Sequence, residues 1–153
     1  VAKHSGKQFA LDISKWARQA EGAVEDVLRG VAINLGKQVI QRTPVDTGRA
    51  KANWMPSPES PDTSTVAVPT GMTKEEAEQY GDRVSTDRLT SLRWDPKTQP
   101  SFFITNSLPY MQRLEYGWSV KQAPQGMVRV TVAQFRKVVG EQIRIVRAKG
   151  RAG

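Results

Sequence analysis

The sequence predicts an α+β domain with a long N-terminal helix, a small antiparallel or mixed sheet, a short helix and an amphipathic C-terminal helix. Apolar residues recur at three- and four-residue steps over residues 14–42 and again over 127–149, which is the period of a helix with one buried face. Between them lies an apolar run of β-prone residues, Phe102 to Thr105. We expect residues 1–153 to form one such domain, because the length fits and no linker divides the chain.

The first expected helix covers residues 14–42. Ser14 is a suitable N-cap, and Pro44 disfavours helical geometry in the residue before it. Glu25 and Arg29 have the spacing of an ion pair on one helix face. The rod would be roughly 44 Å long, whereas a domain of this size has a radius of gyration of only ~15 Å, so we expect part of its apolar surface to be left for a neighbour. Three glycines inside it should allow close contacts or bend it: Gly22, Gly30 and Gly36.

The segment after this helix is rich in turn-forming residues. Residues 44–49 form a turn by composition, in which Gly48 is free to adopt a positive φ. We expect a strand at residues 50–55. An irregular, proline-rich loop should follow over residues 56–72, with a short strand at 65–68.

A small helix is expected next. Thr73 is a good N-cap, and we expect the helix to end at Tyr80. Its first turns carry acidic residues, which the helix dipole favours at that end: Glu75, Glu76 and Glu78. Residues 83–100 show no clear period. We therefore interpret residues 56–100 as a variable, loop-rich insertion.

The C-terminal half should begin with the run 102–105 as a central strand of the sheet. A short helix over residues 108–116, with Pro109 in its first turn, should end at Gly117. After a loop, one continuous amphipathic helix is expected over residues 127–149.

The net charge of +8 is concentrated at the C-terminal end. Beyond residue 128 seven cations accompany one anion, Glu141, so this segment carries six of the eight net charges. The cations are Arg129, Arg136, Lys137, Arg144, Arg147, Lys149 and Arg151. Such a segment attracts nucleic acid or an acidic protein surface, and the plain alternative is a solvated helix face. We expect residues 148–153 to be a flexible basic end and residues 1–8 a flexible N-terminus.

Residues suited to catalysis or metal binding are scarce. The sequence has no cysteine and one histidine, His4, which excludes thiol catalysis and cysteine-based zinc sites and leaves a serine triad dependent on His4 alone. Asp46 is expected to bond the amides of its own turn. The sequence contains no phosphate-binding glycine loop and no apolar run near the ~20 residues that cross a bilayer. We expect neither an enzyme nor a cofactor, a metal site or a membrane partner.

Three sequence blocks occur in a distinctive order. The first covers residues 42–50 with Asn53-Trp54, the second covers 104–110 and runs into 114–117, and the third covers 121–128. Together they resemble the tail-completion, or head–tail joining (neck), family of long-tailed siphoviruses, and this resemblance covers roughly residues 9–140. The residues that carry the first two blocks are Thr43, Pro44, Asp46, Thr47, Gly48, Asn53, Trp54, Asn106, Pro109 and Tyr110.

The resemblance implies a structural subunit of the virion, made in the host cytoplasm and assembled as a ring, commonly a hexamer, around the DNA channel. Its partners would be copies of itself, which can be monomeric before assembly, and the tail-tube, tail-terminator and head-connector proteins. No catalytic residues come with the resemblance. We expect the subunit interface to include Glu115, Tyr116, Gly117, Gln122, Pro124 and Gly126, and the seven C-terminal cations to meet DNA or an acidic partner.

Two alternatives remain open from the sequence. The basic C-terminal helix alone suffices for a non-specific DNA-binding module, because phosphate contacts need charge but no base recognition. A hydrolase that uses the acidic cluster near Glu75 is the weaker alternative, since dipole compensation already explains that cluster.

Overall fold

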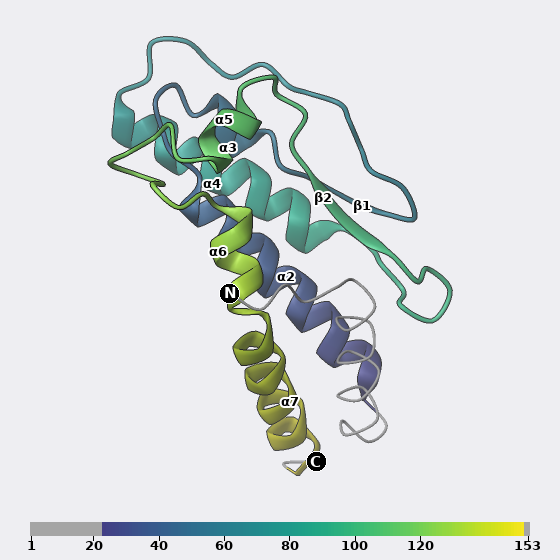
Figure 1. Cartoon of the computed structure of the whole chain (residues 1–153). Coiled ribbons are helices and arrows are strands. Elements are labelled where there is room, and N and C mark those ends of the chain that lie inside the picture. Colours follow the sequence, from purple (N-terminus) through teal and green to yellow (C-terminus); the bar gives the residue numbers. More distant parts are fainter. Residues whose placement is uncertain (1–22, 152–153) are drawn as a thin grey trace.

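The computed structural model describes residues 23–151 and confirms the α+β class (Figure 1). In chain order the elements are α2 (Val24–Arg42), α3 (Arg49–Ala52), β1 (Met55–Pro58), α4 (Lys74–Ser91), β2 (Phe102–Thr105), α5 (Met111–Glu115), α6 (Val128–Ala133) and α7 (Phe135–Arg151). The predictions for residues 1–8, His4, Ser14 and Gly22 lie outside the described residues.

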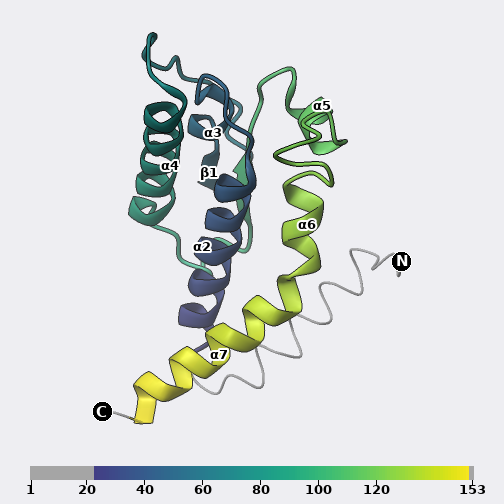
Figure 2. The ribbon, with the colours of Figure 1, turned by 90° about the vertical axis from the view of Figure 1, so that its left-hand side faces the viewer.

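Helix α2 is the element around which the others pack. Figure 2 shows α4 on one side of α2 and α6 on the other, with α7 crossing the N-terminal end of α2. One buried cluster fills the space between the C-terminal half of α2 and α3, α4 and α5: Val39, Ile40, Ala50, Trp54, Leu89, Leu108, Met111, Ala123 and Met127. The second joins α2 to α7: Val27, Val31, Phe135, Val138 and Val139. On the apolar face that we expected to be left for a neighbour, Val27 and Val31 are thus covered by α7 of this chain, whereas residues 14–22 of that face lie outside the described residues.

The end of α2 lies where the sequence predicts it. Thr43 is extended, with φ −70° and ψ 125°, and its hydroxyl donates to the Val39 carbonyl at 2.8 Å. The predicted Glu25–Arg29 pair is wrong. The Glu25 carboxylate instead lies 3.3 Å from Nζ of Lys97, and Arg29 lies 3.4 Å from Asp26. The loop after α4 returns to this end of α2, which local spacing could not reveal.

Gly36 allows the close contacts that we expected of the helix glycines. A Cβ at Gly36 would lie 2.7 Å from Cδ2 of Leu89 in α4 and 2.8 Å from Cδ1 of Ile104 in β2. A Cβ at Gly30 would collide with Gln142 of α7. The two glycines therefore let α2 approach its neighbours on two sides.

The strand expected at residues 50–55 is wrong, because α3 occupies the first half of that range and β1 begins only at Met55. The short strand expected at 65–68 is also absent from the described structure. Asn53 explains why an extended segment there needs no partner strand. Its side chain accepts from the Val66 amide at 2.7 Å and donates to the Val66 carbonyl at 3.0 Å, so it supplies both bonds that a strand would have made.

Helix α4 corrects the interpretation of residues 56–100 as loop-rich. Thr73 is the N-cap, as expected, and it forms a capping box with Glu76: the Thr73 hydroxyl accepts from the Glu76 amide, and the Glu76 carboxylate accepts from the Thr73 amide. The helix does not end at Tyr80, however, but continues to Ser91, which gives it a total length of 18 residues. Its buried residues follow one another at four-residue steps and are mostly small: Ala77, Gly81, Ser85 and Leu89. The sequence did not reveal this buried stripe, because glycine and serine do not count as apolar residues when a helical period is sought.

The sheet consists of two antiparallel strands in the described part of the chain, with Met55 opposite Thr105 and Pro58 opposite Phe102. The strand at Phe102–Thr105 is confirmed, but it is half-buried in a two-stranded pair rather than central. Pro56 and Pro58 lack an amide hydrogen and are tolerated because β1 has a free edge.

The expected continuous helix over residues 127–149 is broken at Gln134 into α6 and α7, which run in different directions (Figure 2). Inside α6 the buried position is Thr131, whose hydroxyl accepts from the Arg42 guanidinium at 3.2 Å, and Val132 is exposed. The change of direction brings α7 across the N-terminal half of α2. Because α7 continues through Arg151, residues 148–151 are helical rather than an irregular end.

Candidate functional site

The turn after α2 is fixed against α4. Gly48 has φ +80°, and a Cβ there would lie 2.6 Å from the carbonyl oxygen of Ala77. The hydroxyl of Thr47, rather than the carboxylate of Asp46, accepts the backbone amide two residues on, at 3.4 Å from Arg49. Asp46 and Thr47 are exposed. This turn therefore presents two polar side chains to solvent while its backbone is held by the core.

The two ends of the first block are joined by a buried hydrogen bond. The indole Nε1 of Trp54 donates to the Thr43 hydroxyl at 2.8 Å. Asn53 is fully buried and also donates to the Arg49 carbonyl at 2.8 Å. These motif residues serve the packing of their own chain, and so does the buried Pro44.

Lys51, between these residues, is a buried charge that sequence reasoning missed. Its side chain is 2% exposed, and Nζ lies 3.1 Å from Asp82 and 3.6 Å from Glu78 of α4. The Ser85 hydroxyl donates to the Lys51 carbonyl at 2.7 Å. A single lysine in a helical turn gives no local signal of burial. Only the packing of α3 on α4 shows it.

The second block is attached to the first through Asn106. Its amide nitrogen donates to the Ala50 carbonyl at 2.8 Å, and its side-chain oxygen accepts from the Leu108 amide at 3.4 Å. Pro109 is exposed and precedes α5, which is shorter than the helix expected over residues 108–116. Partial burial raises the pKa of the Tyr110 phenol, Arg49 opposes that shift and Asp46 adds to it. Tyr110 thus faces the first block across a short gap.

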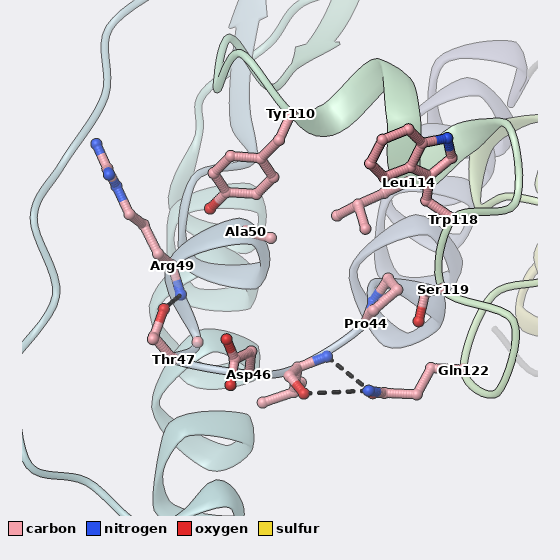
Figure 3. A pocket seen from close by; sticks show the side chains of 12 residues that line it. Pro44, Asp46, Thr47, Arg49, Ala50, Tyr110, Leu114, Trp118, Ser119 and Gln122 are labelled. Carbon is pink, nitrogen blue, oxygen red and sulfur yellow. Dashed lines mark hydrogen bonds between the residues drawn. The ribbon is translucent and has the colours of Figure 1, made fainter.

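The third block bonds to both of the others. The Gln122 side chain accepts from the Val45 amide at 2.9 Å and donates to the Val45 carbonyl at 3.2 Å (Figure 3). The Glu115 carboxylate accepts from three successive amides at the start of α6: Met127 at 2.8 Å, Val128 at 2.9 Å and Arg129 at 2.9 Å.

We had expected Glu115 to contribute to a subunit interface, but its carboxylate is already bonded within its own chain. Burial raises the pKa of its carboxyl, but the amides of Arg129, Val128 and Met127 and the Arg129 guanidinium together hold that pKa below its ordinary value. Arg129 bonds the same carboxylate through Nε at 3.2 Å. Gly117 and Gly126 have φ angles of +91° and +84° and approach the carbonyls of Pro124 and Glu115, which are backbone roles within this chain.

The three blocks meet around one open pocket of about 560 Å³, the central pocket (Figure 3). Its lining residues are Pro44, Val45, Asp46, Thr47, Gly48, Arg49, Ala50, Tyr110, Leu114, Trp118, Ser119 and Gln122. Asp46 is the one carboxylate among them, so the lining offers no second acid for paired acid–base chemistry. Within residues 23–151, no three or more acidic residues or histidines are grouped so that they could hold a metal ion.

Beside this pocket, residues 116–121 expose three large apolar side chains, and we call this segment the aromatic arm. The exposed fractions are 67% for Tyr116, 68% for Trp118 and 76% for Val120. The guanidinium of Arg113 lies 4.6 Å from the centre of the Trp118 ring, and that of Arg129 lies 5.0 Å from the centre of the Tyr116 ring. An exposed apolar cluster rimmed by polar groups is typical of an interaction surface.

The remaining C-terminal cations lie on α7. At ~100° per residue, Arg136, Lys137, Arg144 and Arg147 fall within an arc of roughly 100°, whereas Lys149 falls outside it. Lys137, Arg144 and Lys149 are exposed. Along this face α7 therefore carries a row of cations remote from the central pocket.

No protein-family model, curated protein or solved structure matches this chain. Among the helices of residues 23–151, none is both long and apolar enough to span a membrane.

Proposed function

We propose that this chain is a structural virion protein that completes the tail of a long-tailed bacteriophage and joins it to the head, as one subunit of a ring around the DNA channel. The observation that carries the proposal is the convergence of the three motif blocks. Asn106 bonds the first block from the second, and Gln122 bonds it from the third. A chance match of scattered motifs gives no reason for their parts to bond to one another around one pocket.

The surface next to that pocket also supports an assembly role. A subunit of a ring needs an exposed surface that binds a different surface of the next copy. The aromatic arm keeps large apolar side chains in water, which costs free energy unless a partner covers them. The pocket lining itself suits binding better than catalysis, because apolar residues surround a single carboxylate, that of Asp46.

The location in the particle tests the proposal directly. Virions that carry a labelled copy of the protein are imaged by electron microscopy, and we expect the label at the head–tail junction. A phage that lacks the gene should accumulate filled heads and tails that are not joined. Infectious and properly joined particles made without this protein would refute the proposal.

A second candidate function is non-specific DNA binding through α7, which the row of cations favours. Binding should weaken steeply as salt rises, because each phosphate contact releases counterions. We expect the double variant Lys137→Glu/Arg144→Glu to lose most of the retardation of a DNA duplex at low salt. Arg93→Glu, on an exposed residue outside α7, is the matched control and should retain it. Absence of binding at low salt would remove this candidate.

A further inference from the structure

Two surfaces that flank the central pocket on opposite sides complement each other in net charge and in apolar content. We propose that the aromatic arm of one copy docks into a second pocket, lined by residues 65–72, on the next copy. This inference deepens the proposed function, because it names both surfaces of the contact between subunits.

The arm has the composition of an interface anchor. Tyr116, Trp118 and Val120 alternate with small or polar residues and are all mostly exposed. Tryptophan and tyrosine contribute most when a partner fully desolvates them, and arginine beside them adds to that effect. Arg113 already lies over the Trp118 ring, so the arm presents an aromatic side chain together with a cation.

The receiving surface is an open pocket of about 740 Å³ between the first block and the irregular segment before α4, and we call it the loop pocket. Its walls include the apolar side chains of Val66, Val68, Pro69 and Met72, with Asp46 and Arg49 at the side shared with the central pocket. Pockets of roughly 300–1,000 Å³ enclose ligands larger than an indole ring. The loop pocket therefore has room for Trp118 and part of its flanking chain.

The charges of the two surfaces are opposite. Residues 110–129, around the arm, contain three cations and one anion. That anion, Glu115, is paired with Arg129, so Arg113 and Lys121 give the arm its net positive charge. The lining of the loop pocket itself carries one anion, Asp46, and one cation, Arg49. The flanking residues 59–83 contain six anions and two cations, and two of these anions, Glu78 and Asp82, are paired with the buried Lys51. Contact between the unlike surfaces is attractive, whereas contact of either surface with its own copy brings like charges together.

The positions of the two surfaces suit a repeating contact. Figure 3 shows Trp118 at one side of the central pocket and Arg49, which borders the loop pocket, at the other. A contact between surfaces on different sides of one subunit leaves one of each kind free at the ends. Such a contact repeats from copy to copy until a ring closes or a filament grows.

Cross-linking between introduced cysteines tests this contact, since the chain has none of its own. Lys121 and Thr70 are exposed residues at the edges of the arm and the loop pocket. The double variant Lys121→Cys/Thr70→Cys, treated at high protein concentration with a flexible bismaleimide, should give a ladder of covalent oligomers. A mixture of the two single variants should stop at dimers, because each copy then carries one thiol. Thr90→Cys in place of Thr70→Cys is the matched control and should give no ladder.

Substitution of the anchor completes the test. Trp118→Ala in the double variant should lower the yield of oligomers about tenfold, while circular dichroism shows an unchanged fold, since Trp118 is mostly exposed. A ladder no stronger than that of the Thr90→Cys control, or one insensitive to Trp118→Ala, would overturn the inference. If the variants still self-associate through other surfaces, the inference fails but the proposed function stands. If the double variant gives the expected ladder but the labelled protein is absent from the head–tail junction of virions, the proposed function fails and the inference stands.

Discussion

Replacing Gly48 by alanine should destabilise the protein more than the same change at Gly71, although the two glycines have almost the same backbone angle. Their φ values are +80° and +79°. Placing alanine in this left-handed region costs about 1–2 kcal/mol at either position. At both positions alanine also reduces the conformational entropy of the unfolded chain, which stabilises the folded state by about 0.4–1 kcal/mol. These contributions cancel when the two variants are compared.

The surroundings of the added methyl group differ between the two positions. At Gly71 no atom lies within 4 Å of the Cβ, whereas at Gly48 the Ala77 carbonyl oxygen lies at 2.6 Å. That oxygen belongs to the backbone of α4, so no side-chain rotation relieves the contact. Forcing an extra methyl into a packed region costs about 1–3 kcal/mol. We therefore expect Gly48→Ala to lose about 1–3 kcal/mol more than Gly71→Ala.

Urea unfolding followed by tryptophan fluorescence measures this difference. An unchanged slope against urea concentration shows that both variants keep the same compactness, so that the midpoints can be compared. Equal losses in the two variants would show that the turn does not rest on α4 as described. A smaller loss at Gly48 than at Gly71 would refute the reasoning altogether.

Three further predictions concern polar contacts. Glu115→Gln should lose about 1–2 kcal/mol at neutral pH, since hydrogen bonds to a charged group are the stronger kind, while the surface control Asp87→Asn should be nearly neutral. The pKa of Glu115 is lowered in the folded state, so the ionised carboxylate contributes its full stabilisation above the pKa of the unfolded state and loses it as the pH falls through the pKa of the folded state. The difference in free energy of unfolding between wild type and Glu115→Gln, measured by urea titration, should therefore shrink below about pH 4.5. A difference that stays constant with pH would contradict the role of the carboxylate. Trp54→Phe should cost about 1–2 kcal/mol in thermal unfolding, since it leaves the buried Thr43 hydroxyl without its donor; an unchanged midpoint would argue against that bond. Lys51→Met should cost less in urea unfolding than the double variant Glu78→Gln/Asp82→Asn, because Lys51→Met leaves one buried carboxylate oxygen, Oδ1 of Asp82, on side chains that are 54% and 40% exposed, whereas the double variant leaves a fully buried ammonium without a counter-charge. The reverse order would contradict the burial of Lys51.

The candidate site could be predicted from the sequence only in part. The motif blocks were recognisable, and the turn at Gly48 and the end of α5 at Gly117 both have the positive φ that their composition indicates. The bonds between the blocks were not predictable, because Asn106 to Ala50 spans 56 residues and Gln122 to Val45 spans 77. That the Glu115 carboxylate is bonded within its own chain was unpredictable for the same reason, since the amides that donate to it lie 12 to 14 residues further along.

The sequence by itself determined the features that arise within a few neighbouring residues: the end of α2 at Thr43, the capping box at Thr73 and the strand at Phe102. In each of these a local steric or hydrogen-bonding preference is strong enough to decide the outcome. Only the tertiary structure decided the length of α4, the break of the C-terminal helix at Gln134 and the hydrogen bonds of the Asn53 side chain to the backbone of Val66. Those features depend on which distant surface is available for packing. The alanine, glycine and serine of α4 form a buried stripe only because α2 and α3 pack against them.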